Sequence, residues 1–589
     1  MSDMMEKQLL SGNEAIARGA WEAGVKVAAG YPGTPSTEIL ENLVRFKQDV
    51  YCEWAPNEKV ALEMAAGAAL TGVRALVTMK HVGLNVAADP LMTLSYIGIV
   101  GGLVIVAADD PGMHSSQTEQ DTRQYARLAK VPVFEPGNAR EASAFIRRAF
   151  EISEKYRTPV IFRTTTSVSH SRALVEVGAR TGAGTANFEK NPPQFVPIPV
   201  WGRKLRVRVE ERVAEQAAEA SRAADLNFVL RGTEKGGLGI ISSGLTALHC
   251  TDIFPEADIL KLGWSWPFPD ELIRRFAAEH ESVAVIEEAD PILEEHVKSL
   301  GIDCRGKDVV PRVGELVPLK LREVRAKLFG ESFAPPQPPP EDLPGRPPIL
   351  CAGCPHRGVF YALGKFDVIV TGDIGCYSLG VFPPLSRTDV ILCMGGGFSM
   401  SQGMVKAGEK RPVVGIVGDS TFFHSGITGL LDIVYNKGNS TLIVVDNRTT
   451  AMTGHQDHPG TGRTLMGEPT AAASIEKIAE ACGMKRIRVV DPYRLDEVAA
   501  VLKEELAADE PSLIISRAPC LLKERKPVGP VQEIDHEACR NCRSCLKLGC
   551  PAIESSGKSK PAINAQLCAG CDMCRQVCRF TAIHEKSSC

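Results

Sequence analysis

The sequence predicts a multidomain α/β protein that ends in a small cysteine-rich module. Short apolar segments, bounded by glycine and separated by stretches with helical spacing, recur along most of the 589 residues. A proline-rich segment at 333–347 interrupts this alternation, and eight cysteines lie between positions 539 and 578. A chain of this length has room for roughly three or four domains.

The first α/β domain is expected over residues 1–180. The first 24 residues have the pattern of an amphipathic helix. Buried parallel strands are expected at 73–78, 102–107 and 159–163. A polar connector follows at 181–235, with a helix expected at 207–224.

Two further α/β domains are expected on either side of the proline-rich linker at 333–347. The one at 236–332 has strands predicted at 239–244 and 283–287. The one at 348–527 has strands predicted at 368–370, 413–417 and 442–446. Residues 528–589 form the cysteine-rich module.

Composition restricts the class of protein. The chain is 44% hydrophobic and 23% charged, with a formal net charge of -4, so no basic excess points to nucleic acid. No apolar run reaches the roughly 20 residues that span a bilayer, and the start does not resemble a signal peptide. We expect a cytoplasmic protein of an oxygen-poor cell, without a membrane or nucleic-acid partner.

The cysteines predict two [4Fe–4S] clusters. In two-cluster ferredoxins the fourth cysteine of each run ligates the other cluster. The expected ligand sets are therefore Cys539, Cys542, Cys545 and Cys578, and Cys568, Cys571, Cys574 and Cys550. The alternatives are structural zinc, which does not usually use a third cysteine at the same spacing, and disulfides, which do not suit a reducing compartment. The first run closes after four residues instead of three, and Arg579 replaces the usual proline after the second.

Oxygen ligands are predicted at the ends of two neighbouring strands. Asp419 follows the strand at 413–417, and Asn447 follows the strand at 442–446. Carboxylate and amide oxygens at one edge of a parallel sheet suit Mg²⁺, whose coordination is usually completed by diphosphate oxygens. The alternative is an aspartate that only caps a helix.

The residues 418–420 and 446–447 resemble the thiamine diphosphate motif. This resemblance implies that Asp419, the Asn447 side chain and the Thr449 carbonyl bind Mg²⁺, and that Gly418 and Ser420 contact the cofactor. The turn Tyr31-Pro-Gly-Thr-Pro-Ser36 is similar to one in the 2-oxoacid:ferredoxin oxidoreductases, which implies that Thr34 and Pro35 lie at the cofactor. The same resemblance makes Glu58 the catalytic glutamate, with Glu53 and Glu63 as alternatives.

The order of motifs along the chain resembles the large (α) subunits of the indolepyruvate branch of that family. The resemblance implies a pyrimidine-binding-type domain at 1–180, a transketolase C-terminal-like domain at 236–332, a thiamine diphosphate and Mg²⁺ domain at 348–527, and a two-cluster ferredoxin module at 528–589. Motifs at 351–357 and 372–377, expected at strand starts, and at 453–456 place Cys376, His455 and Gln456 at the cofactor. Cys351 and Cys354 are either a metal or redox pair or residues that shape the pocket.

The activity implied by the resemblance is oxidative decarboxylation of an arylpyruvate. Coenzyme A would accept the acyl group, and ferredoxin the electrons. A smaller β subunit is the expected partner, in a dimer of heterodimers. Lys80, His81 and Arg123 are candidates for binding the substrate. The alternatives are another 2-oxoacid (pyruvate, 2-oxoglutarate or phenylglyoxylate), a non-redox thiamine-dependent decarboxylase, and a subunit that only transfers electrons.

Overall fold

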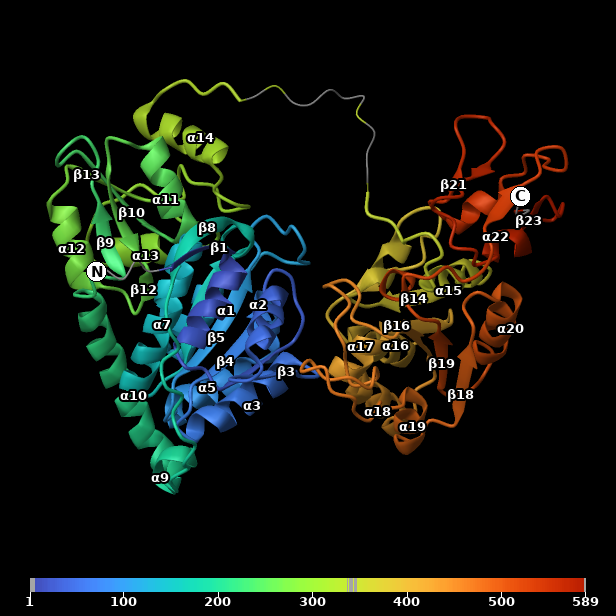
Figure 1. The fold of residues 1–589 in the computed structure, drawn as a ribbon, viewed down its shortest axis with the longest axis horizontal. Coiled ribbons are helices and arrows are strands. Elements are labelled where there is room, and N and C mark those ends of the chain that lie inside the picture. The colour runs from blue at the N-terminus through green and yellow to red at the C-terminus, as the bar shows by residue number, and fades with distance from the viewer. Residues whose placement is uncertain (1–5, 336, 338–342, 344–346, 587–589) are drawn as a thin grey trace. The chain divides into compact units, whose positions relative to one another are not determined.

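The computed structural model describes residues 6–335, 337, 343 and 347–586. The chain forms two compact units, residues 1–338 and 339–589 (Figure 1). The division falls inside the segment predicted to be a linker, of which residues 336, 338–342 and 344–346 lie outside the described residues. No helix in the described part of the chain is long and apolar enough to cross a membrane.

The larger sheet of unit 1 has seven strands in the order β12-β6-β7-β5-β4-β2-β3. All neighbours are parallel except β12 and β6. The strands are β2 (Val27–Gly30), β3 (Tyr51–Trp54), β4 (Ala75–Lys80), β5 (Leu103–Asp109), β6 (Val133–Phe134), β7 (Val160–Thr165) and β12 (Trp264–Trp266). Every residue of β4, β5 and β7 is buried, as expected for a parallel sheet covered by helices.

Helices cover this sheet in two groups. Helix α1 (Gly12–Glu22) packs against α2 (Thr37–Leu43) and α7 (Ala139–Tyr156). Helix α3 (Glu58–Leu70) packs against α5 (Ala88–Ile97), which contacts α10 (Pro199–Ala220). Helix α10 begins eight residues before the helix predicted at 207–224, because Pro199 suits a first turn, where its missing N–H would have no partner.

The predicted N-terminal helix is wrong over its first part. Glu6–Ser11 is strand β1, which pairs antiparallel with β8 (Arg172–Val177). Helix α1 starts only at Gly12, where the Ser11 hydroxyl accepts a hydrogen bond from the Glu14 amide (3.2 Å) and the Glu14 carboxylate accepts one from the Ser11 amide (2.8 Å). This reciprocal cap ends the strand and begins the helix. Residues 1–5 of the predicted helix lie outside the described residues.

A four-stranded sheet in unit 1 has the order β13-β10-β11-β9. Its strands are β9 (Asn227–Leu230), β10 (Leu238–Ser243), β11 (Asp258–Leu262) and β13 (Ser282–Val285). Strand β9 comes from the predicted connector. Strand β12, from the segment that builds this smaller sheet, joins the larger one. The two sheets of unit 1 are therefore tied together by the backbone.

Unit 2 is built on six parallel strands in the order β15-β14-β16-β17-β19-β18. They are β14 (Ile369–Gly372), β15 (Val390–Ile391), β16 (Val413–Gly418), β17 (Thr441–Asp446), β18 (Arg486–Val490) and β19 (Ser512–Arg517). The cysteine-rich module adds two small antiparallel pairs. These are β20 (Gln532–Ile534) with β23 (Ile583–Glu585), and β21 (Ile553–Glu554) with β22 (Ala562–Ile563). Leu495, at the start of α20 (Leu495–Glu505), packs with buried module residues such as Leu548 and Met573.

Candidate functional site

The carboxyl ends of β16 and β17 bring Asp419, Asn447 and Thr449 together in unit 2. Gly418 pairs with Val445, so both strands end at the same edge of the sheet. Asp419 is buried, and its Oδ2 accepts a hydrogen bond from the Thr449 amide at 3.2 Å. The three residues expected to bind Mg²⁺ thus meet at one point of the sheet edge.

Asn447 has an oxygen available for a metal ion. Its Nδ2 lies 3.3 Å from His356 Nε2, while its Oδ1 is buried and has no hydrogen-bond partner among the described residues. A buried oxygen without a donor costs roughly 1–3 kcal/mol. Mg²⁺ prefers oxygen ligands, so the residues present fit this ion.

His458 also belongs to this site and was not anticipated from the sequence. It is buried, and its Nε2 lies 3.0 Å from Asp419 Oδ2. Burial alone would raise the pKa of Asp419, but His458 and hydrogen bonds hold it below its usual value. The only signal for His458 in the sequence was its position two residues after Gln456. The Gln456 side-chain amide is bonded to Thr453: its Oε1 accepts from the Thr453 hydroxyl at 2.6 Å, and its Nε2 donates to the Thr453 carbonyl at 2.8 Å. His455 is partly exposed with a positive φ of 69°.

The loop at 372–377 shapes the space beside Gly418. A Cβ on Gly418 would lie 2.6 Å from the Tyr377 ring, so only glycine fits there. Asp373 is fully buried and accepts a hydrogen bond from the Gly395 amide at 2.6 Å. Burial raises the pKa of Asp373 to about 8 although backbone N–H groups oppose this. The expectation that this loop begins a strand is wrong, because it follows the carboxyl end of β14.

Cys376, in that loop, lies near three other cysteines outside the module. Cys351 and Cys354 precede helix α15 (His356–Leu363) rather than a strand, and Cys520 follows β19. Burial, and then the neighbouring Cys520 and Cys351, raise the pKa of Cys376 to about 11. Burial likewise raises the pKa of Cys354 to about 12, with Cys351 and Cys376 adding to the effect.

The glycine between Cys351 and Cys354 is enclosed by two other cysteine-bearing segments. A Cβ on Gly353 would lie 2.6 Å from the Ala569 Cβ and 2.7 Å from Leu521 Cδ1. These residues directly follow Cys568 and Cys520. The sequence did not indicate Cys520, because its position near the other cysteines depends on where β19 lies in the sheet.

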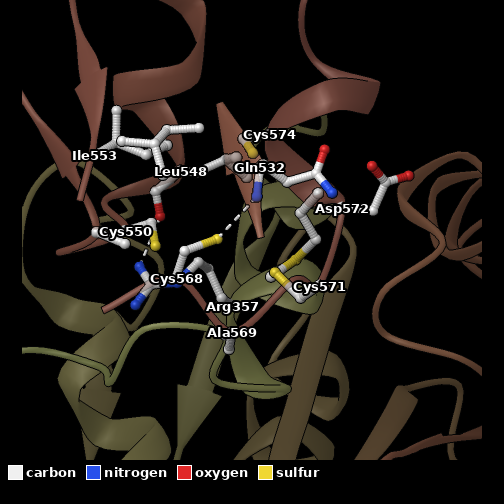
Figure 2. A pocket seen from close by; sticks show the side chains of 14 residues that line it. Arg357, Gln532, Leu548, Cys550, Ile553, Cys568, Ala569, Cys571, Asp572 and Cys574 are labelled. Carbon is white, nitrogen blue, oxygen red and sulfur yellow. Dashed lines mark hydrogen bonds between the residues drawn. The ribbon is translucent and has the colours of Figure 1, made fainter. Parts of the chain in front are cut away.

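The eight module cysteines surround two cavities. One is lined by Cys550, Cys568, Cys571 and Cys574 (Figure 2). The other is lined by Cys539, Cys542, Cys545 and Cys578. Among the described residues, no three His, Cys, Asp or Glu side chains are grouped closely enough to hold a single metal ion. Each cysteine of a [4Fe–4S] cluster binds a different iron, and the two sets have the composition expected from the spacing.

Only the first of these cavities includes residues from the rest of unit 2. Gly353 and Arg357 line it together with the four cysteines. The backbone N–H of Gln532 donates a hydrogen bond to Cys568 Sγ at 3.4 Å (Figure 2). The cavity of the Cys550 set is therefore the nearer of the two to the Cys351 loop.

Glu58 is the buried carboxylate among the three candidates in unit 1. It is 5% exposed at the first position of α3, where the Asn57 side chain caps the helix. Glu63 is exposed and paired with Lys59, and Glu53 is partly buried on β3. A Cβ on Gly83, in α4 (His81–Val86), would lie 2.5 Å from Glu58 Oε1. The carboxylate thus occupies space that only a glycine leaves open.

Thr34, Lys80 and His81 gather near residues 110–118, at the carboxyl end of the larger sheet. Lys80 is the last residue of β4, not a residue after it, and its Nζ donates to the Ser115 carbonyl at 2.8 Å. The Ser115 hydroxyl donates to the Thr34 carbonyl at 3.3 Å. Burial lowers the pKa of Lys80 to about 8, although Asp110 opposes this. His81 Nδ1 is buried without a hydrogen-bond partner among the described residues.

Pro35 lies in the same turn as Thr34, and its carbonyl accepts a hydrogen bond from the Asn13 side chain at 2.7 Å.

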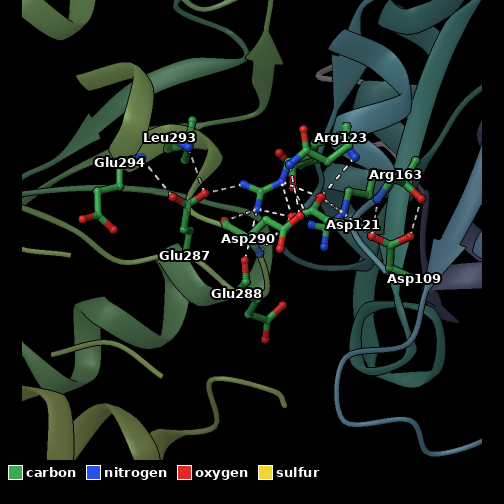
Figure 3. Close-up of polar contacts among 12 residues, drawn as sticks. Asp109, Asp121, Arg123, Arg163, Glu287, Glu288, Asp290, Leu293 and Glu294 are labelled. Atoms are coloured by element: carbon green, nitrogen blue, oxygen red, sulfur yellow. Dashed lines mark hydrogen bonds and ion pairs between the residues drawn. The ribbon is translucent and has the colours of Figure 1, made fainter. Parts of the chain in front are cut away.

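Arg123 lies in a buried ion network instead of an open pocket (Figure 3). It is 2% exposed, donates to Asp121 at 2.6 Å and to Glu287 at 2.8 Å, and also reaches the Glu288 carbonyl at 3.1 Å. Arg163 joins the network through Asp121 at 4.0 Å and extends it to Asp109 at 2.7 Å. Because each nitrogen of the guanidinium already donates to a protein group, the structure gives Arg123 a structural role rather than that of a substrate ligand. Its contacts join the domain of the larger sheet to the segment of the smaller one.

Known proteins resemble this chain over most of its length. Residues 18–200 match the family model described as "Pyruvate flavodoxin/ferredoxin oxidoreductase, thiamine diP-bdg". Residues 373–516 match "Thiamine pyrophosphate enzyme, C-terminal TPP binding domain". The presence of both thiamine diphosphate-binding domains expected from the motifs is thus confirmed.

Relatives with curated names agree with these matches. Subunits named "Indolepyruvate oxidoreductase subunit IorA" are 41% identical in Methanothermobacter marburgensis and 40% identical in Pyrococcus horikoshii. Each alignment covers 98% of this chain and 97% of the relative. Because this identity extends over nearly its whole length, the chain belongs to the family of indolepyruvate oxidoreductase IorA subunits and is a subunit of a 2-oxoacid:ferredoxin oxidoreductase.

Proposed function

We propose that the protein catalyses the coenzyme A-dependent oxidative decarboxylation of arylpyruvates, of which indolepyruvate is the type, and transfers the electrons to ferredoxin. The products are the aryl-acetyl-CoA, CO₂ and reduced ferredoxin. The observation that supports a redox reaction is that two sets of four cysteines surround cavities in the same compact unit as Asp419 and Asn447. The aryl specificity is proposed from the name of the relatives.

The residues of unit 2 would hold the diphosphate end of the cofactor. When bound, thiamine diphosphate supplies a nucleophilic carbon and accepts the electron pair released with CO₂. Asp419 Oδ, Asn447 Oδ1 and the Thr449 carbonyl would bind Mg²⁺. His458 would hold the Asp419 carboxylate in position (3.0 Å). The backbone at Gly418 and Ser420 would lie against the cofactor, with Cys376, His455 and Gln456 on neighbouring loops.

The residues of unit 1 would handle the proton and the substrate. Glu58 would exchange a proton with the aminopyrimidine, since it is the buried carboxylate at the start of a helix. Thr34 and Pro35 would support the ring. The Lys80 ammonium and His81 would contact the substrate carboxylate, because they meet at the carboxyl end of the sheet, where ligands bind in open α/β folds.

We further propose an electron path through three groups of cysteines. The Cys550 set and the Cys539 set would each hold a [4Fe–4S] cluster, as their ferredoxin-type spacing predicts. Cys351, Cys354, Cys376 and Cys520 would bind a further cluster, because their mutual proximity marks them as a third set. The order from the third set to the Cys550 set follows from the contact of Gly353 with Ala569.

An anaerobic assay of this chain with its small subunit tests the proposal. It contains thiamine diphosphate, Mg²⁺, coenzyme A and a viologen acceptor, and it compares indolepyruvate, phenylpyruvate, pyruvate and 2-oxoglutarate. We expect dye reduction mainly with the two aryl substrates, and none in Asp419→Ala with its iron content retained. A preference for pyruvate or 2-oxoglutarate would overturn the proposed arylpyruvate specificity. Release of aldehyde and CO₂ without dye reduction would indicate a non-redox decarboxylase instead.

A further inference from the structure

A buried cation without a carboxylate partner lies between two groups of cysteines. Arg357 is 1% exposed. Its Nη1 donates to the Leu548 carbonyl (2.7 Å), and its Nη2 donates to the carbonyls of Leu350 (2.7 Å) and Cys351 (2.9 Å). Its Nε is buried with no partner among the described residues. All these acceptors are neutral backbone groups.

A buried guanidinium paired only with neutral groups is energetically costly. Removing a charge from water costs several kcal/mol unless an opposite charge compensates it. Arg123 and Arg163 follow this rule, since each contacts carboxylates. Arg212, which is 8% exposed and donates only to backbone carbonyls, shows the cost instead, because burial lowers its pKa to about 10. We therefore expect an anion beside Arg357 that is not an Asp or Glu side chain.

The missing anion is expected in the cavity that Arg357 lines. That cavity is also lined by Cys550, Cys568, Cys571 and Cys574, and Figure 2 shows Arg357 on the same side of it as Cys550 and Cys568. A [4Fe–4S] cluster with four thiolates is negatively charged in both oxidation states, and its reduction adds one electron without making or breaking a bond. A neighbouring cation stabilises the reduced state more than the oxidised one. Water does not screen this interaction, because the guanidinium is buried.

We propose that Arg357 is a positioning residue that compensates the charge of the cluster on the Cys550 set and raises its reduction potential. The inference rests on the proposed function, since it requires that this cluster is present. Its hydrogen bonds to Leu350 and Cys351 on one side and Leu548 on the other also hold the Cys351 loop against the module. The same side chain would thus fix the distance between two successive electron carriers.

Redox titration followed by EPR tests this proposal in the complete enzyme. The signal of the cluster is assigned by its loss in Cys574→Ala. We expect Arg357→Met to shift its reduction equilibrium at least about tenfold toward the oxidised state, which is 59 mV for a one-electron couple. Arg357→Lys should keep most of the wild-type potential, because it retains the charge.

Arg543→Gln is the matched control. Arg543 lines the cavity of the Cys539 set and also bonds backbone carbonyls, but it is partly exposed, so water screens its charge. Its loss should shift the potential of that cluster less. If Arg357→Met does not hold iron, the lysine variant decides: a retained potential supports charge compensation, and a lowered potential overturns it, because only hydrogen bonds were lost. Full iron with an unshifted potential in Arg357→Met also overturns it, whereas wild-type enzyme without iron would refute the proposed clusters themselves.

Discussion

Replacing Arg123 by methionine should destabilise unit 1 rather than weaken substrate binding. The change removes the guanidinium that is 2% exposed and that pairs with Asp121 at 2.6 Å and Glu287 at 2.8 Å. Removing one partner of a buried ion pair lowers the free energy of unfolding by about 3–5 kcal/mol. At roughly 2 °C per kcal/mol for a unit of this size, thermal unfolding should begin about 6–10 °C lower.

The acid dependence of stability should change in the same variant. Burial alone would raise the pKa of Asp121, but Arg123 lowers it to about 2. A carboxyl whose pKa is depressed in the folded state stabilises the fold at pH values above its unfolded-state pKa, about 3.9. This contribution is lost as the pH falls through the folded-state pKa, about 2. Arg123→Met should lose much of this contribution, so the stability difference from wild type should be smaller at pH 2 than at pH 6.

Calorimetry and steady-state kinetics of the complete enzyme test this reasoning. Arg127→Met is the matched control, because Arg127 lies on the same helix α6 (Thr122–Ala129) but is only partly buried. It should cost no more than about 1 kcal/mol. The double variant Arg123→Met with Glu287→Met should recover part of the lost stability, since no unpaired carboxylate remains at 287, whereas Asp121 keeps only Arg163, 4.0 Å away. An Arg123→Met enzyme that unfolds at the wild-type temperature but has a strongly raised KM would refute the structural role and restore the substrate-binding hypothesis.

Three further predictions concern the proposed cofactor and substrate residues. Asn447→Ala should weaken Mg²⁺-dependent binding of thiamine diphosphate at least about tenfold in calorimetric titration, without lowering the unfolding temperature; unchanged affinity would remove Asn447 from the site. Gly83→Ala should displace the Glu58 carboxylate, whose Oε1 would lie 2.5 Å from the new Cβ, and lower kcat at least about 100-fold. Gly67→Ala, on helix α3 with Glu58 and with open space around it, should be neutral; equal activities of the two variants would refute the clash. The KM for the 2-oxoacid should rise as the pH rises through about 8, because the Lys80 ammonium loses its proton there, and a pH profile unchanged in Lys80→Gln would contradict this.

The sequence by itself determined much of the local structure. Buried apolar runs predicted the parallel strands, because a strand covered on both faces must be apolar throughout. Asp419 and Asn447 were placed at one sheet edge because parallel strands end on the same side. The eight module cysteines were divided into two sets by their spacing alone, and the structure gathers the same sets around separate cavities. In each case the information lies within a few residues or repeats with a regular period.

Only the tertiary structure decided which side chains from distant segments meet. Arg123 looked like an anion-binding residue in the sequence, but Glu287, 164 residues later, occupies it. Cys520 joins the Cys351 loop because of the position of β19 in the sheet, and His458 reaches Asp419 only because its loop folds back over the strand ends. These contacts depend on sheet order and on packing between segments far apart in the chain, which leave no periodic or local pattern in the sequence.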